Sequence, residues 1–403
     1  MTSLTGHNMD FDKLRMLSQK NEVQIDNYTG HKRTPPYYYD SLRHAFGAYF
    51  NTFHTQNAIY EFYAQGLHDG DVKILRGQLL DEDNTVLTII GFERFFELFF
   101  KDLLRKVNRN LIYISLDRIS GSNKVQTLIN RIESKTFVPR KFKNRLLSIP
   151  FRETIDRFYG LAELVKSGNT SNSILPKFGR LLKKYSFLDM GNHKASMQLL
   201  NWYRDRILHN GNRLPSLWLL DYLVTQRFVP AVNNIIETEQ KKLGESMYYM
   251  TTVTGINILD RLNNVQFEFS DLKKQEKGND MFIMLLYIGH LKELGRANLN
   301  MNLFVRNNTQ ATFEYNYKDP IGRGKRFAQA EQSGYEHFRE IKSCPCCGEE
   351  SMVVYRHTIN DILNQGKKLN IEWVKCYTCD YHLRYNVGNP QFFNLHHEQI
   401  FEV

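Results

Sequence analysis

The sequence predicts a mostly α, multidomain protein with a helical bundle in its middle and a small, β-rich, cysteine-containing module near its C-terminal end. Three observations support this prediction. Apolar residues recur at three- and four-residue steps through much of the first 245 positions, which is the period of amphipathic helices. All five cysteines lie between Cys344 and Cys379. The length of 403 residues exceeds that of a typical single domain.

The composition excludes several classes of protein. Hydrophobic residues at 42% and charged residues at 24% lie near globular averages, which excludes wholly disordered, collagen-like and coiled-coil chains. The longest apolar stretch, Met281 to Ile288, is far shorter than the roughly 20 residues that a membrane helix needs. The first ten residues lack the basic residues and the apolar run of a secretory signal. We therefore expect a cytoplasmic protein with no membrane association.

Four regions are expected along the chain. They are an N-terminal helical region over 1–80, a helical domain over 81–245, a mixed α/β connector over 246–340 and a cysteine-bearing module over 341–403. The connector contains β-prone stretches at Gln266–Phe269 and Ala311–Tyr315. Asp319–Lys325, with one proline and two glycines, is interpreted as a turn or linker.

The first predicted helix lies in an aromatic-rich stretch from Tyr37 to Tyr63. An aromatic stripe at helical spacing is typical of a buried core, and we favour that interpretation over a base-stacking surface. The side chains that form the stripe are Leu42, Phe46, Tyr49, Phe50 and Phe53.

A second, longer helix is predicted to begin after Asp83 as its N-cap and to run to about Lys106. Its apolar face is so wide that the helix must be nearly surrounded by other elements. Leu111–Leu116 predicts a short strand or a further helical turn. Further helices are predicted at 122–134, 152–167, 174–186, 192–209 and 215–240, which makes this region an all-α bundle.

Two C-x-x-C pairs, Cys344 with Cys347 and Cys376 with Cys379, are separated by 28 residues and form the strongest motif in the chain. Four thiolates close a tetrahedral shell around Zn²⁺ with no open position, so the pattern predicts structural rather than catalytic zinc. A redox pair is the competing interpretation. Three alternating segments are expected to supply the strands that hold the metal: Met352–Tyr355, Ile371–Lys375 and Tyr381–Tyr385.

The first pair lies in the sequence CPCCG and resembles the C-P-x-C-G turn of zinc ribbons, a resemblance that covers about residues 341 to 388. Cys346 is then a spare thiol, and His357 and His382 are reserve ligands. Ile359–Asn364 is interpreted as an inserted helix. A ribbon of this kind either stabilises the fold or contacts nucleic acid or protein.

The net charge of +10 favours polyanionic partners, because Lys and Arg release counterions from phosphates on binding. The excess is concentrated between Lys101 and Pro150, where 12 Lys or Arg stand against 3 Asp or Glu. This segment is either an RNA-binding surface or a solvated basic face. Its densest part contains Arg140, Lys141, Lys143 and Arg145.

Arg204, Asp205 and His209 form the candidate catalytic group, at the end of a predicted helix that stops at Asn210-Gly211. Arginine binds phosphate oxygens with a planar fork, and histidine exchanges a proton near neutral pH. Because an RNA 2′-hydroxyl supplies its own nucleophile, this pair suits cleavage without a metal. Arg206 is expected to be a secondary RNA contact.

The segment from Arg204 to His209 resembles the R-x(4-6)-H motif of the HEPN superfamily, with the polar Asp205 after the arginine. A glutamate-bearing helix at Phe92–Leu98, some 110 residues earlier, is similar to the one that opens HEPN domains. The resemblance covers roughly residues 81 to 245 and implies a HEPN-like helical bundle. It also implies a metal-independent endoribonuclease that acts as a homodimer and leaves a 2′,3′-cyclic phosphate. A bacterial toxin or antiphage defence effector, with a companion antitoxin or sensor protein, is the role it suggests.

Helix geometry restricts how these residues cooperate. Residues five apart on an ideal helix point about 140° apart, so Arg204 and His209 share a site only if the helix ends or a second subunit completes it. Glu93 and Glu97 are expected either to orient this pair or to form ordinary ion pairs. The alternatives to catalysis are a nucleic-acid-binding protein and a regulatory partner of another enzyme, in which Arg204 forms a surface ion pair and His209 caps the helix.

Overall fold

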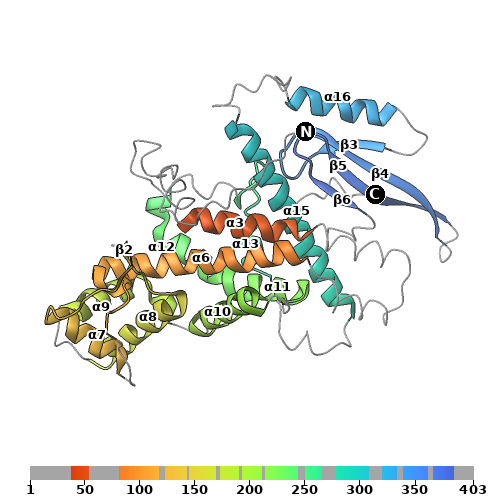
Figure 1. The fold of residues 1–403 in the computed structure, drawn as a ribbon. Helices are drawn as coiled ribbons and strands as arrows, with labels where there is room; N and C mark the ends of the chain where they lie inside the picture. The colour runs from red at the N-terminus through yellow and green to blue at the C-terminus, as the bar shows by residue number, and fades with distance from the viewer. Residues whose placement is uncertain are drawn as a thin grey trace, which may run out of the picture.

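The computed structural model describes residues 38–53, 81–117, 123–142, 145–168, 173–189, 193–210, 214–243, 250–265, 278–307, 320–333, 339–361 and 366–384. In this part of the chain the protein is mostly helical, with a small antiparallel sheet near the C-terminal end (Figure 1). None of the helices described there combines the length and the apolar character needed to cross a bilayer.

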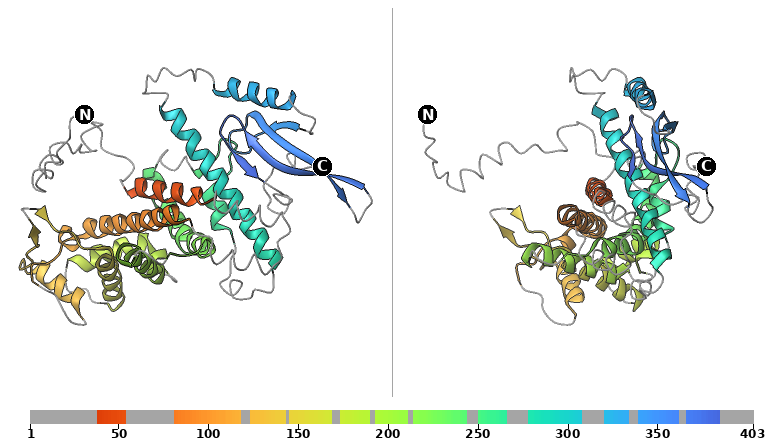
Figure 2. Two further views of the ribbon diagram at one scale, coloured as in Figure 1. Left: turned by 45° about the vertical axis from the view of Figure 1, so that its right-hand side comes forward. Right: turned by 90° about the vertical axis from the view of Figure 1, so that its right-hand side faces the viewer.

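The aromatic stripe forms helix α3 (Tyr38–Asn51), which packs against the long helix α6 (Glu82–Val107). The two helices run side by side in Figures 1 and 2. Every residue of the predicted stripe is buried, so its interpretation as core is confirmed. The N-cap of α6 is Asp81 rather than Asp83, because the Asp81 carboxylate accepts the amide hydrogen of Asn84 at 3.1 Å.

The helices that follow α6 match the predicted ranges to within a few residues. They are α7 (Lys124–Glu133), α8 (Phe151–Lys166), α9 (Ile174–Lys184), α10 (His193–Asn210), α11 (Leu217–Leu223) and α12 (Val229–Leu243). A π-helical turn, η3 (Val224–Phe228), joins the last two, so they replace the single helix predicted at 215–240. The ambiguous segment at Leu111–Leu116 ends a 3-10 turn, η1 (Arg109–Ile112), and then forms isolated bridges at Tyr113 and Ser115.

A buried carboxylate joins the first described helix to the last helix of the bundle. Glu239 of α12 accepts hydrogen bonds from Tyr38 at 2.6 Å and from Tyr185 at 2.6 Å, and Tyr39 lies at 3.4 Å. Burial and the bond to Glu239 raise the pKa of Tyr38, so its hydroxyl remains a donor. The N-terminal helix therefore shares the hydrophobic core of the bundle.

Helix α15 (Gly278–Asn307) crosses the molecule between the bundle and the sheet, as the diagonal helix in Figure 1 and the left view of Figure 2 shows. It contributes a fully buried ion pair, because Lys292 Nζ lies 2.5 Å from Asp221 Oδ1 of α11. The ring of Tyr49 lies 4.6 Å from the same ammonium group. Burial lowers the pKa of Lys292, and the adjacent carboxylate opposes that shift.

The described part of the predicted connector is helical, with α13 (Ile258–Asn263), α15 and α16 (Pro320–Ser333). The β-prone stretches Gln266–Phe269 and Ala311–Tyr315 lie outside the described residues. The turn predicted at Asp319–Lys325 is wrong, since α16 begins at Pro320, where the first helical turn needs no amide donor. Gly324 is explained by contact instead: a Cβ there would lie 2.2 Å from Thr378 Oγ1.

The sheet is a meander of four antiparallel strands in chain order. They are β3 (Arg339–Ser343), β4 (Glu350–Asp361), β5 (Gly366–Cys376) and β6 (His382–Arg384). The three predicted strands are confirmed, and β3 is additional. The inserted helix expected at Ile359–Asn364 is wrong over its first three residues, because 359–361 extend β4 and pair with 366–368 of β5.

The two faces of the sheet pack against different helices. Met352 and Val354 point into the main core, whereas Val353 and Tyr355 pack with Ala328 of α16. This is the alternation that a pleated strand imposes. The helical body and α16 thus cover opposite faces of the sheet. The cysteines and the face toward the helical body belong to the main hydrophobic core, whereas the face toward α16 forms a second, smaller cluster.

We expect Lys292→Met to lower the free energy of unfolding by about 3–5 kcal/mol, because it leaves the Asp221 carboxylate buried without a cation. Denaturant titration followed by circular dichroism measures the loss. The double variant Lys292→Met/Asp221→Asn removes both charges and should recover part of the stability. A single variant that is as stable as the double variant would contradict this account.

Candidate functional site

The C-terminal half of α10 faces a groove of about 550 Å³ between α10 and α8. Asp205, Arg206 and His209 of the predicted site line it. Helix α8 contributes Arg152 and Asp156 to the opposite side. The structure thus brings a proton carrier and two guanidinium groups together at one surface.

Arg206 and Trp202 form the best-defined contact in the groove. The guanidinium carbon of Arg206 lies 3.8 Å from the centroid of the Trp202 ring, in a cation–π arrangement. Trp202 is nevertheless 44% exposed, so one part of its ring remains accessible. Asp205 accepts a hydrogen bond of 3.0 Å from the side-chain amide of Asn201, one helical turn earlier, and this bond orients the carboxylate. Both pairs are four residues apart and therefore share a helix face.

Arg204 does not line this groove. Its Nη1 lies 2.9 Å from Asp205 Oδ1, and its Nε lies 3.8 Å from Glu93 Oε1 on α6. Arg204 and His209 therefore point in different directions within one chain, as their spacing on a helix requires. Helix α10 ends at Asn210, and Gly211 lies outside the described residues.

Glu93 is a buried carboxylate beside the candidate motif. Burial raises its pKa to about 7, and the neighbouring Glu97 adds to the shift, while Arg204 and Lys101 oppose it. The Oε1 atom of Glu93 has no hydrogen-bond partner among the described residues. Glu97 forms an ion pair with Lys101 on its own helix instead. Of the two glutamates, only Glu93 lies at ion-pair distance from the motif.

A second, shallower groove of about 380 Å³ continues along α8 toward α7. It shares Arg152 and Asp156 with the first groove and adds Lys124 and Pro150. The two grooves therefore adjoin along α8. A small hairpin, in which 141–142 pair with 145–146, precedes this helix in the chain.

This hairpin carries the basic cluster. Strands β1 (Lys141–Phe142) and β2 (Arg145–Leu146) pair antiparallel, and Phe142 of β1 is 57% exposed. Three of the predicted RNA contacts are exposed there: Arg140, Lys141 and Arg145. Lys143 lies outside the described residues.

The four predicted metal ligands converge. The sulfur atoms of Cys344, Cys347, Cys376 and Cys379 all lie within 4.8 Å of one another, and all four residues are buried. The Cys344–Cys379 and Cys347–Cys376 sulfur distances are 3.5 and 3.6 Å. A tetrahedral shell with metal–sulfur bonds of about 2.3 Å has sulfur atoms about 3.8 Å apart. The site therefore fits one metal ion.

The two knuckles have the same local geometry. In each, the residue after the second cysteine adopts a left-handed conformation, with φ +77° at Gly348 and +60° at Asp380. Each of these residues donates its amide hydrogen to the carbonyl of the first cysteine of its pair. Amides also point at the sulfur atoms, since Cys346 N and Thr378 N each lie 3.4 Å from the sulfur of the first cysteine. Such donors stabilise thiolates.

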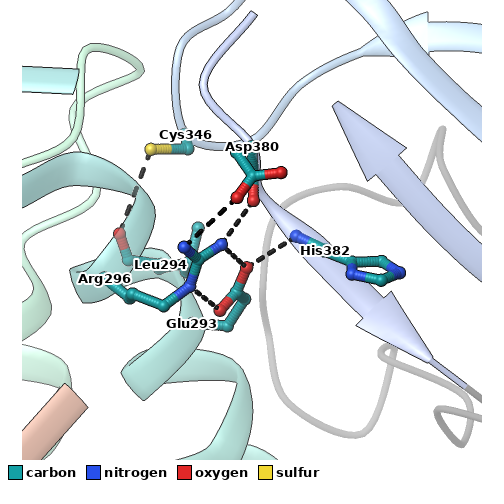
Figure 3. Close-up of polar contacts among 6 residues, drawn as sticks. All are labelled: Glu293, Leu294, Arg296, Cys346, Asp380 and His382. Atoms are coloured by element: carbon teal, nitrogen blue, oxygen red, sulfur yellow. Dashed lines mark hydrogen bonds and ion pairs between the residues drawn. The ribbon is translucent and has the colours of Figure 1, made fainter. Parts of the chain in front are cut away.

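Helix α15 anchors the second knuckle, as Figure 3 shows. The guanidinium of Arg296 donates two hydrogen bonds of 2.7 Å to Glu293 and further bonds to the backbone and side-chain oxygens of Asp380. Glu293 also accepts the amide hydrogen of His382 at 2.6 Å. The imidazole of His382 is not part of the four-sulfur cluster, and its ring lies 5.6 Å from that of Trp373.

The first knuckle is anchored as well. The Cys346 thiol is fully buried and lies 3.9 Å from the carbonyl oxygen of Leu294 on α15 (Figure 3). The backbone amide of Val253 donates to the Cys346 carbonyl at 3.1 Å, and the Thr254 hydroxyl donates to Pro345. Cys346 therefore stands outside the four-sulfur cluster, as predicted. His357 lies in β4, and its side chain is outside the described parts.

Sequence reasoning missed the residues that reach the site from other elements. Neither Arg152 nor Trp202 lies in a motif identified from the sequence. The position of Trp202 four residues before Arg206 is a local signal that identifies a shared helix face. The contact of Arg296 with Asp380 spans 84 residues and that of Glu293 with His382 spans 89, so neither has a local signal.

No protein-family model matches this sequence, and neither a curated protein nor a solved structure gives a significant match.

We expect each chain to bind one metal ion through the four-sulfur cluster. Cys376→Ser should lose the metal and destabilise the sheet, because metal-binding energy in such sites is folding energy. Elemental analysis and thermal unfolding measure both effects. Cys346→Ser, a matched control outside the cluster, should keep its metal. Freshly purified wild-type protein without metal would contradict the assignment.

The raised pKa of Glu93 makes stability depend on pH. The folded protein holds this proton up to about pH 7, whereas the unfolded carboxyl loses it near 4.5, so stability falls as pH rises between these values. The loss should be on the order of 2 kcal/mol. Glu93→Gln should remove it, as measured by denaturant unfolding at pH 5 and pH 8.

Glu82→Gln is the control, because it neutralises an exposed carboxylate on the same helix and should change stability equally at both pH values. If Glu93→Gln and the wild-type protein respond identically to pH, Glu93 is not the titrating group.

Proposed function

We propose that this protein is a metal-independent endoribonuclease that cleaves RNA through attack of the 2′-hydroxyl. One observation carries the proposal: the groove along α10 places the imidazole of His209 beside the guanidinium groups of Arg206 and Arg152 and the exposed ring of Trp202. Proton transfer, phosphate binding and base stacking are the three tasks of such a site. The resemblance of Arg204–His209 to the HEPN motif supports the same reaction.

In the proposed mechanism His209 removes the proton from the 2′-hydroxyl. The 2′-oxygen then attacks phosphorus, and the bond from phosphorus to the 5′-oxygen breaks. A proton carrier supplies a proton to the leaving 5′-oxygen, which yields a 2′,3′-cyclic phosphate and a free 5′-hydroxyl. Arg206 binds the phosphate in the groove, since it lies three residues from His209 and on the same side of the helix.

A homodimer would bring Arg204 into this chemistry. In one chain Arg204 faces Glu93 and Asp205, away from the groove that His209 lines. A two-fold axis near the end of α10 would place the Arg204 of one copy near the His209 of the other. Asp205 would then hold Arg204 in position while its second oxygen stays bonded to Asn201.

The remaining parts of the proposal concern partners and context. We propose that the hairpin with Arg140, Lys141 and Arg145 contacts the RNA backbone, and that Zn²⁺ is the metal of the four-sulfur cluster, because four thiolates leave no open position. The HEPN resemblance suggests a cytoplasmic toxin or antiphage effector that a companion antitoxin or sensor protein restrains.

One observation favours a second candidate, a non-catalytic RNA-binding or regulatory protein. Arg204 is engaged by two carboxylates in the single chain, and one of them, Glu93, belongs to the buried face of α6. In that case the groove and the hairpin bind RNA, and Arg204 is structural.

Cleavage of total RNA by purified protein tests the two candidates. We expect His209→Ala and Arg206→Ala to lower the cleavage rate by about 10²- to 10⁴-fold, because general acid–base transfer and phosphate binding are lost. Lys194→Ala, at the other end of α10, is the control and should cleave normally. A substrate with deoxyribose at the scissile position should resist wild-type enzyme.

Two results would contradict the proposal. Normal cleavage of the deoxy substrate would show that another nucleophile attacks. If wild-type protein binds RNA but does not cleave it, and the His209→Ala variant binds equally well, the non-catalytic candidate is correct.

A further inference from the structure

A separate cavity of about 740 Å³ lies where α3, α6 and α15 meet. It shares no lining residue with the groove of His209. The proposed ribonuclease chemistry makes no use of it. Its volume lies within the range of about 300–1,000 Å³ that is typical of small-molecule sites.

The ionisable residues that line this cavity are three arginines and a histidine. Arg43 and His44 come from α3, Arg94 from α6 and Arg296 from α15. Within the described ranges, no aspartate or glutamate lines the cavity. Among the described residues, neither Arg43 nor Arg94 forms an ion pair or a hydrogen bond, although most other arginines near the core have carboxylate partners. Two positive charges therefore border the cavity without a protein anion to balance them.

The rest of the lining is suited to an organic ligand. Leu87, Ile90 and Leu299 supply apolar surface, and Leu87 is 57% exposed. Three side-chain amides add hydrogen-bond donors and acceptors: Asn51, Asn84 and Asn300. A few polar groups set in an apolar lining are characteristic of ligand pockets.

Gly47 keeps the floor of the cavity open. It lies inside α3, where glycine destabilises a helix relative to alanine. Packing does not require a glycine here, because the nearest atom to an added Cβ would be Leu299 Cδ1 at 3.7 Å, an ordinary contact distance. A larger side chain at this position would enter the cavity. A larger side chain at position 47 would fit against its neighbours, yet glycine leaves this part of the cavity empty.

We propose that this cavity binds a phosphate monoester with an apolar or planar organic part, of about the size of a mononucleotide. A phosphate monoester carries a charge of about −1.5 to −2 at neutral pH, which matches the two arginines that lack a protein partner. Guanidinium groups bind phosphate oxygens in a bidentate manner. The organic part packs against Leu87, Ile90 and Leu299.

Arg296 gives this site a connection to the metal module. The same side chain that lines the cavity also binds Glu293 and Asp380, the residue that follows the last cysteine ligand (Figure 3). Because four of its five N–H donors already bond these oxygens, Arg43 and Arg94 provide the main ligand contacts. A bound ligand packs on the helix that holds the sheet and should raise the thermal stability of the whole protein.

Isothermal titration calorimetry with three probes tests the proposal: adenosine 5′-monophosphate, adenosine and inorganic phosphate. The monophosphate should bind saturably, and both adenosine and inorganic phosphate should bind about tenfold more weakly or worse. Arg43→Gln and Arg94→Gln should each weaken monophosphate binding by about tenfold, because a charge-assisted bond is lost. Arg105→Gln makes the same charge change at an exposed position of α6 and should bind as the wild-type protein does.

Gly47→Leu fills the cavity without changing charge and should abolish binding, while Gly47→Ala should retain the fold and confirm that the helix tolerates a side chain there. All variants should cleave RNA at the wild-type rate, so a failure of the ribonuclease proposal leaves this test intact.

Three results would overturn the inference. They are absence of saturable binding by the wild-type protein, wild-type monophosphate affinity in Arg43→Gln and Arg94→Gln, and equal affinity for inorganic phosphate and the monophosphate. Loss of RNA binding in the two arginine variants, without any binding of the small probes, would assign the cavity to an RNA path instead.

Discussion

Three charged side chains on one stretch of α15 are removed from water, and the architecture depends on how they are paired. Lys292 reaches Asp221 in the bundle, whereas Glu293 and Arg296 bind each other and the second knuckle of the sheet. A buried charge without a partner costs several kcal/mol, so α15 has a stable position only when the bundle lies on one side and the sheet on the other. Apolar side chains around α15 supply most of the free energy of burial. The charged pairs determine how α15 is positioned along the bundle and the sheet.

Buried charge pairing also explains why the cysteine module packs tightly against the helical body. A metal ion fixes the four sulfur atoms, but Asp380 holds a left-handed backbone conformation that L-residues adopt rarely. The Arg296 bonds to its backbone and side-chain oxygens offset that cost. Metal binding and docking to α15 therefore support each other. The candidate zinc site thus stabilises the helical body as well as the sheet.

Sequence patterns predicted the features that local chemistry controls. The period of apolar residues located helices such as α6 and α8, and the spacing of Cys344, Cys347, Cys376 and Cys379 located the metal cluster, because both signals repeat over a few residues. Contacts between distant segments overrode local signals elsewhere. Gly324 suggested a turn, but it sits in a helix that approaches Thr378. Strand β3, half-buried and mostly polar, carries no clear alternation. Tertiary packing alone places Arg152 in the groove of His209 and Arg43 in the cavity between α3, α6 and α15, so no local pattern identifies either residue.

The hydrogen bond between Tyr38 and Glu239 has a consequence for synthesis on the ribosome, because its partners are 201 residues apart in the chain. At a translation rate of about 5–20 residues per second, roughly 10–40 s pass between the synthesis of Tyr38 and that of Glu239. During that interval the aromatic stripe already has α6 to pack against, but the Tyr38 hydroxyl has no carboxylate acceptor. The first described helix is therefore synthesised early, but its polar contact with the bundle forms only after α12 has been made.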